Sequence, residues 1–181
     1  MSSQTIEGGR PSPFARRALL AFIGLWLAVQ ILMPLRHLLY PGSPHWTEEG
    51  HRFAWQMKLR DKKAEAIFTV RDPASGVEWT VYPEDFLVPH QARTMPSRPD
   101  MILQFAHYLG QVWRDEEGLE NVQVRARVCA SLNGRRGALL IDPQRDLVPV
   151  ERDLWPADWI LPLDQPFERP PERTRRRDIV C

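Results

Sequence analysis

An uncharged apolar run near the start of the chain limits the possible folds more than any other feature. Residues 18–35, ALLAFIGLWLAVQILMPL, contain no ionisable side chain. Because an α-helix rises about 1.5 Å per residue, a helix of this length can cross a thin bilayer. Pro41 and Gly42 follow and end the run. We therefore expect a transmembrane helix over residues 17–40, with the lipid bilayer as its partner.

The basic residues around this segment predict its orientation. Arg10, Arg16 and Arg17 precede it, and Arg36 alone follows closely. Cytoplasmic flanks of membrane helices carry an excess of lysine and arginine. We therefore expect residues 1–16 in the cytoplasm and the rest of the chain outside it, in a periplasm or a lumen.

Two alternatives compete with a membrane-spanning helix. A cleaved signal peptide requires a shorter apolar core and a site of small residues, whereas residues 34–38 read PLRHL. A helix buried in a soluble core would be equally apolar on all sides. Gln30 and Pro34 interrupt the apolar run and favour contact with other membrane helices, although single anchors tolerate both residues.

Alternating patterns after the apolar run predict β-strands. The stretch RFAWQMKLR, residues 52–60, alternates strictly between apolar and polar side chains, which is typical of a half-buried strand. Residues 61–63 read as a polar turn. Residues 64–71 and 77–82 read as two further strands, joined by a turn that contains Pro73 and Gly76. These segments predict a three-stranded meander.

The second half of the outer part predicts a helix and a hairpin. Ser97 is a candidate cap, with Asp100 three residues on, for an amphipathic helix that ends near Arg114. Residues 122–132 alternate as a strand, Asn133 and Gly134 are a hairpin turn signal, and residues 138–142 would be the partner strand. The expected fold class is α+β: a transmembrane helix, then a mainly antiparallel sheet with one covering helix over residues 45–165.

The C-terminal residues 166–181 are rich in arginine and proline and include RTRRR. This composition is typical of a disordered tail. Binding of the tail to anionic lipid headgroups is the alternative.

Several classes of function have no support in the sequence. The net charge of +1 argues against a nucleic-acid partner. The five histidines lack the paired spacing of a zinc site, and the phosphate-binding and nucleophile motifs are absent. Glu48 and Glu49 are adjacent, so we expect them to be solvated or to cap a turn. Cys129 and Cys181 cannot form a disulfide framework and say little about the redox compartment.

Several blocks, in order, resemble a known family. They run from LMPLRHLLYPGSPHWTEEGHRFAWQMKLR through VRDPASGVEW and RPDMILQFAHYL to RVCASLNGRRGALLIDPQRDL. This stretch, Leu32 to about Leu163, is similar to the C-terminal part of the vitamin K-dependent gamma-glutamyl carboxylase family, which includes the horizontally transferred transmembrane domain (HTTM) proteins.

The resemblance implies a reaction in which oxygenation of reduced vitamin K generates a base. That base removes a proton from a peptide glutamate, and CO2 then adds to the carbanion. The family's catalytic lysine is expected in further membrane helices that precede this portion. The lysines of this chain, Lys58, Lys62 and Lys63, lie in or beside the first predicted strands. We expect no catalytic residue and no cofactor in this chain, with reduced vitamin K serving the complete family enzyme.

The resemblance also places the strip HRFAW in the family's glutamate and substrate-binding region. The candidate substrate-binding residues are Trp46, His51, Arg52, Phe53 and Trp55. Phe53 and Trp55 could line an apolar groove, although such a stripe is more often the core of a sheet. Arg52 offers a charge-assisted fork to a carboxylate, and His51 offers a second donor when it is protonated.

Two hypotheses follow. The chain is either the membrane-anchored outer part of a carboxylase-like protein, inactive without helices encoded elsewhere, or a noncatalytic single-pass protein whose β domain binds a peptide or a partner membrane protein. In the first case the partners include other transmembrane helices of a split carboxylase and a peptide substrate.

Overall fold

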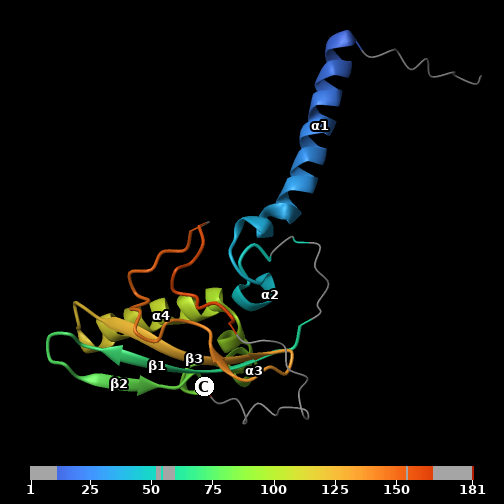
Figure 1. Cartoon of the computed structure of the whole chain (residues 1–181). Helices are drawn as coiled ribbons and strands as arrows, with labels where there is room; N and C mark the ends of the chain where they lie inside the picture. Colours follow the sequence, from blue (N-terminus) through green and yellow to red (C-terminus); the bar gives the residue numbers. More distant parts are fainter. Residues whose placement is uncertain (1–11, 52–53, 55–59, 154, 165–180) are drawn as a thin grey trace, which may run out of the picture.

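The computed structural model describes residues 12–51, 54, 60–153, 155–164 and 181 of the chain. A long helix, α1 (Pro13–Leu35), projects from a head in which helices cover one face of a β-sheet (Figure 1). The α+β prediction is confirmed.

Helix α1 is the predicted apolar segment. Ser12 caps it by accepting a hydrogen bond from the Ala15 backbone N–H at 3.2 Å. Within the described residues, Pro13–Leu39 is the segment long and apolar enough to cross a membrane, with a mean hydropathy of 2.2. Only 6% of that segment is buried, which argues against the buried-core alternative. Pro34 is the one buried residue of the helix itself.

Two short helices connect α1 to the head. The 3₁₀ turn η1 (Arg36–Leu39) ends α1, and α2 (Pro44–Thr47) follows the loop at Pro41 and Gly42. The predicted strand over residues 52–60 falls almost entirely outside the described residues.

The sheet is antiparallel, in the order β2-β1-β3-β4. Its strands are β1 (Lys62–Arg71), β2 (Glu78–Val81), β3 (Gln123–Leu132) and β4 (Ala138–Leu139). The predicted strands over residues 64–71, 77–82 and 122–132 are confirmed. The predicted turn at residues 61–63 is wrong at two positions, because Lys62 and Lys63 pair with Leu132 and Ser131 as the first residues of β1. Lysine is uncommon in strands, so the sequence favoured a turn at these two positions. In the structure they pair with the last residues of β3 and extend β1 along its whole length.

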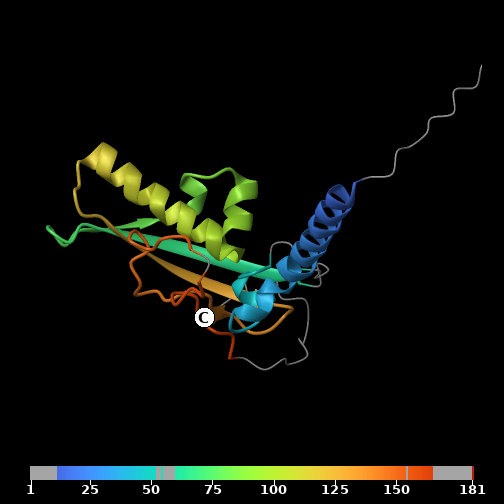
Figure 2. The same cartoon turned by 90° about the horizontal axis from the view of Figure 1, so that it is seen from above.

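The inner face of the sheet packs against helix α4 (Pro99–Glu117), which lies across it (Figure 2). Phe68 of β1 meets Phe105 of α4 edge to face, with ring centroids 4.9 Å apart. The predicted helix is confirmed, but its cap is not. Ser97 instead donates its hydroxyl to the Thr94 carbonyl at 2.8 Å, because it closes a 3₁₀ turn, η3 (Met95–Ser97). The turn η2 (Pro83–Asp85) and helix α3 (Pro89–Thr94) precede it.

The Asn133–Gly134 hairpin is confirmed. Both residues have positive φ, 53° and 76°, and the Asn133 side chain accepts a hydrogen bond from the Asp61 N–H at 2.8 Å. The returning strand is shorter than predicted. β4 ends at Leu139, and Ile141 instead forms a bridge with Ile160 of the C-terminal loop.

A disulfide lies on the opposite face of the sheet from α4. Cys129 of β3 is bonded to Cys181, with their Cα atoms 5.8 Å apart. The sequence did not predict this single bond, which forms because alternation along β3 turns Cys129 to the outer face, where a residue 52 positions later can reach it. The predicted disordered tail lies outside the described residues, except for Cys181.

Candidate functional site

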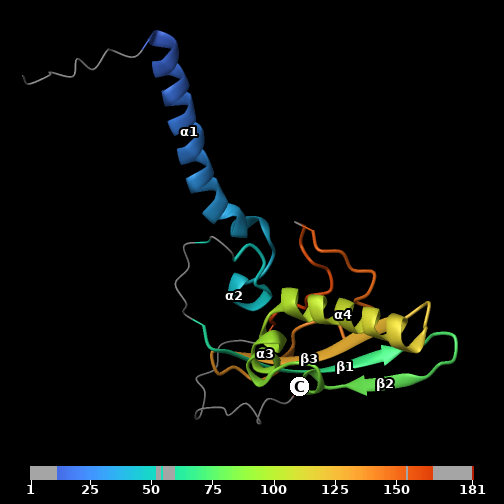
Figure 3. The same cartoon turned by 180° about the vertical axis from the view of Figure 1, so that it is seen from behind.

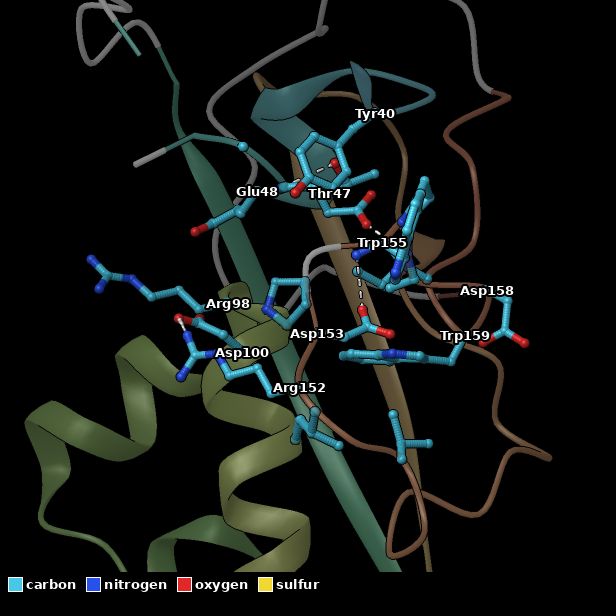
Figure 4. A pocket seen from close by; sticks show the side chains of 18 of the residues that line it. Tyr40, Thr47, Glu48, Arg98, Asp100, Arg152, Asp153, Trp155, Asp158 and Trp159 are labelled. Carbon is cyan, nitrogen blue, oxygen red and sulfur yellow. Dashed lines mark hydrogen bonds and ion pairs between the residues drawn. The ribbon is translucent and has the colours of Figure 1, made fainter. Parts of the chain in front are cut away.

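A cavity of about 750 Å³ lies where α1 meets the head (Figure 4). It is bounded by η1 and Tyr40, by α2 and the turn after it, by the first turn of α4, and by the loop over residues 145–160. Its wall carries the neutral imidazole of His51 and charged side chains of both signs: Arg36, Glu48, Glu49, Arg60, Arg98, Asp100, Arg145, Glu151, Arg152, Asp153 and Asp158.

Close packing against η1 fixes the turn after α2. Glu48 ends α2 in the left-handed region, with φ 62°. Gly50 is buried and also has φ 62°, and a Cβ at this position would lie 2.6 Å from the Cα of His37. Only glycine fits so close an approach. The turn over residues 48–51 is therefore held directly against the foot of α1.

The candidate substrate-binding residues separate in the structure. His51 lines the cavity. Trp46 is 1% exposed, and its indole N–H donates to the Leu161 carbonyl at 2.8 Å, so it packs in the core and does not line the cavity. Arg52, Phe53 and Trp55 lie outside the described residues.

Three of the cavity's arginines are paired with acidic side chains. The Arg60–Glu48 and Arg152–Asp100 distances are 3.0 Å, and the Arg145–Asp158 distance is 3.5 Å. The other two arginines of the wall, Arg36 and Arg98, form no ion pair with any described residue, and Arg98 is exposed. Two cationic groups thus remain available to an anionic ligand.

His51 is held in a neutral state. Burial lowers the pKa of its imidazole, the cationic Arg60 lowers it further, and Glu48 partly opposes both effects. Its Nδ1 atom is buried and has no hydrogen-bond partner among the described residues. A neutral imidazole has one donor and one acceptor nitrogen, so His51 can accept a proton as well as donate a hydrogen bond.

The buried environment of Lys62 was not predicted from the sequence. Its side chain is 3% exposed, its Nζ donates to the Trp46 carbonyl at 2.6 Å, and Glu48 lies 3.9 Å away. Burial lowers the pKa of Lys62 to about 7, with Arg60 adding to the effect and Glu48 opposing it. Of the two expectations for Glu48, the solvated carboxylate is wrong, because its side chain is 14% exposed and lies near Arg60 and Lys62. The alternative that it caps a turn is confirmed, since Glu48 is the C-terminal cap of α2.

Glu49 holds the loop that closes the other side of the cavity. Its Oε1 accepts a hydrogen bond from the Ala157 N–H at 2.7 Å. Burial raises the pKa of Glu49, although the bonds to Ala157 and Thr47 oppose the shift. Glu49 is therefore not simply solvated, and its bonds to Thr47 fit the alternative expectation that it caps the turn. No local pattern reveals the contact with Ala157, since its partners are 108 residues apart.

The cavity is more polar than a quinol site. A naphthoquinol needs a mostly apolar pocket, whereas about half of the residues that line this cavity have ionisable side chains. No group of three or more metal-ligating side chains occurs in the described part of the chain.

A family comparison identifies the head. The model for the vitamin K-dependent gamma-carboxylase lumenal domain matches residues 15–166. The chain belongs to this lumenal domain family. No curated protein and no solved structure matches it. The lumenal family and the exposed apolar helix together indicate a membrane-anchored protein with an extracytoplasmic domain.

Proposed function

We propose that this lumenal domain binds the glutamate-containing peptide on which a complete carboxylase acts, and that the reaction itself needs membrane helices outside this chain. The observation that carries the proposal is the cavity at the foot of α1, where Arg36 and Arg98 have no acidic partner among the described residues. In a gamma-carboxylase family, a site for a peptide carboxylate at the membrane surface is the function that such a wall fits best.

The chemistry of the wall supports a carboxylate ligand. An arginine fork binds a carboxylate through two parallel charge-assisted hydrogen bonds. Arg98 and His51 line the same cavity, so a glutamate held by Arg98 would share that cavity with the imidazole. The neutral His51 would then offer a hydrogen bond without adding charge.

The proposal includes a cytoplasmic N-terminus and a head outside the cytoplasm. The arginines before α1 support this orientation. The disulfide between Cys129 and Cys181 supports it independently, because disulfides persist in the periplasm, the lumen of the endoplasmic reticulum and the extracellular space.

Peptide binding to the full chain in lipid nanodiscs tests this function. A fluorescent glutamate-rich peptide should bind, and the matched glutamine peptide should bind at least about tenfold more weakly, which corresponds to roughly 1.4 kcal/mol. Arg98→Gln should weaken glutamate-peptide binding by a similar factor. The control is Arg114→Gln, an exposed arginine of α4 that does not line the cavity. Equal affinity for both peptides would overturn the proposal.

A noncatalytic binding protein is the second candidate. No lysine among the described residues lines the cavity, and the amine of Lys62 donates to the Trp46 carbonyl. Co-expression with a companion protein that carries the missing helices separates the two candidates. Quinol-dependent fixation of CO2 into the glutamate peptide supports the carboxylase, whereas peptide binding without fixation supports the noncatalytic module.

A further inference from the structure

One wall of the cavity is a loop that extends toward the membrane side of the molecule. Residues 149–153 and 155–160 line the cavity. In Figures 1 and 3 the loop rises past α4 to the level of η1, where α1 begins its course away from the head. The loop therefore reaches the height at which the apolar helix would enter a bilayer.

Three contacts fix the loop in this raised position. Arg152 is paired with Asp100 of α4 at 3.0 Å on one side. The Ala157 N–H is bonded to Glu49 at 2.7 Å on the other. Between them, the Trp155 N–H donates to the Asp153 carboxylate at 3.0 Å (Figure 4). The raised loop is thus tied to α4 and to the turn that follows α2.

The tip of the loop presents a large apolar side chain to solvent. Trp155 is 76% exposed, whereas Trp159, four residues later, is 7% exposed and belongs to the core. The segment η1 lies at the level of the loop in Figure 1, and its residues Leu38 and Leu39 are 70% and 81% exposed. Exposed apolar side chains, a tryptophan among them, thus occur beside a membrane helix. Tryptophan is enriched where membrane proteins cross the lipid–water interface.

We propose that Trp155 lies in the headgroup region of the leaflet that α1 enters, so that the head is attached to the membrane at a second point. The inference rests on the insertion of α1 that the proposed function assumes. Indole is favoured at this depth because its ring is apolar and its N–H is polar. Glu151 and Asp153 flank the tip and outnumber Arg152, so the partner is the zwitterionic interface and not an anionic lipid.

Site-directed fluorescence on the full chain in phosphatidylcholine vesicles tests the contact. Both native cysteines are in the disulfide, so an environment-sensitive dye reacts only with an introduced cysteine. The test variant is Trp155→Cys. The membrane control is Leu25→Cys within α1, and the solvent control is Thr80→Cys, an exposed residue of β2.

The dye at position 155 should show blue-shifted emission, quenching by a nitroxide carried on the lipid headgroup, and protection from aqueous iodide. The dye at position 80 should show the opposite behaviour. If the dye at position 25 is quenched by a nitroxide on the lipid chain while that at 155 behaves like that at 80, the second attachment is wrong and the membrane anchor stands. If position 25 also behaves like position 80, both the attachment and the anchor are wrong.

Discussion

The packed layer of sheet and helix and the cavity at the foot of α1 are built by different means. In the layer, the inward-facing side chains repeat every second residue along the strands and every three or four residues along α4. They pack against one another in a single core. The cavity is assembled from a turn, a helix start and a loop that are more than 100 residues apart at their extremes. Its contacts are single hydrogen bonds and ion pairs.

Substitutions in the two regions should therefore affect different properties of the protein. Apolar burial stabilises the layer in proportion to area, so substitutions there should affect the free energy of unfolding most. The cavity contains partly buried charges whose net contribution to stability is small. Its substitutions should change pH dependence and local order more than global stability.

The largest expected effect comes from the core. Phe68→Ala removes a ring that is fully buried against Phe105 and should lower the free energy of unfolding by about 3–5 kcal/mol. The measurement is urea denaturation of the detergent-solubilised chain, followed by tryptophan fluorescence. The control is Ile67→Ala, the neighbouring residue on the outer face, which is 43% exposed and should cost less than about 1 kcal/mol. Equal losses would mean that α4 does not cover the sheet as described.

The disulfide should contribute next. A cross-link between residues 52 positions apart lowers the conformational entropy of the unfolded chain. In the chain-entropy account this raises the free energy of unfolding by about 4 kcal/mol. Cys129→Ser should therefore lower stability by up to that amount and make it insensitive to dithiothreitol. Reduction of the wild-type chain should reproduce the loss. If reduction leaves the wild-type denaturation curve unchanged, the cross-link contributes nothing.

Lys62 should give the head a specific pH dependence. Its pKa is about 7 in the folded chain against an ordinary 10.5, so the unfolded chain binds more protons between these values. Stability should therefore fall as the pH drops through this window, by about 2 kcal/mol from pH 9 to pH 7. Lys62→Met should abolish this dependence, as measured by urea denaturation across the range. Lys63→Met, a change in the adjacent and more exposed lysine, should preserve it.

The smallest effect is local. Glu49→Ala leaves the Ala157 N–H without its acceptor and should cost about 1 kcal/mol. Hydrogen exchange at the Ala157 amide should become faster, while exchange within β3 is unchanged. Glu49→Gln retains an acceptor oxygen and should restore most of the protection. Faster exchange throughout the head would instead indicate global destabilisation.

Periodicity made most of the layer predictable from the sequence. The alternation over residues 64–71 and 122–132, the turn at Asn133 and Gly134, and the helix up to Arg114 all depend on neighbours close in the chain, and the structure confirms them. Lys62 was misassigned because a charged residue at the start of a strand resembles a turn. Its amine is buried only because the Trp46 carbonyl and Glu48 meet it there.

The cavity was much less predictable. His51 was a candidate by family resemblance, and the structure brings it to the wall. The contacts of Glu49 with Ala157 and of Arg152 with Asp100 connect segments that no local pattern relates. Trp46 was a reasonable candidate for ligand contact, since tryptophan often lines sites, but its indole is directed at Leu161 in the interior.

The close contact between Gly50 and His37 joins the foot of the membrane helix directly to the wall of the cavity. The turn carrying Glu48 and His51 has no slack against η1, since even a methyl group would not fit between them. Any side chain at position 50 would force η1 and this turn apart, and so move the foot of the membrane helix away from the wall that carries His51.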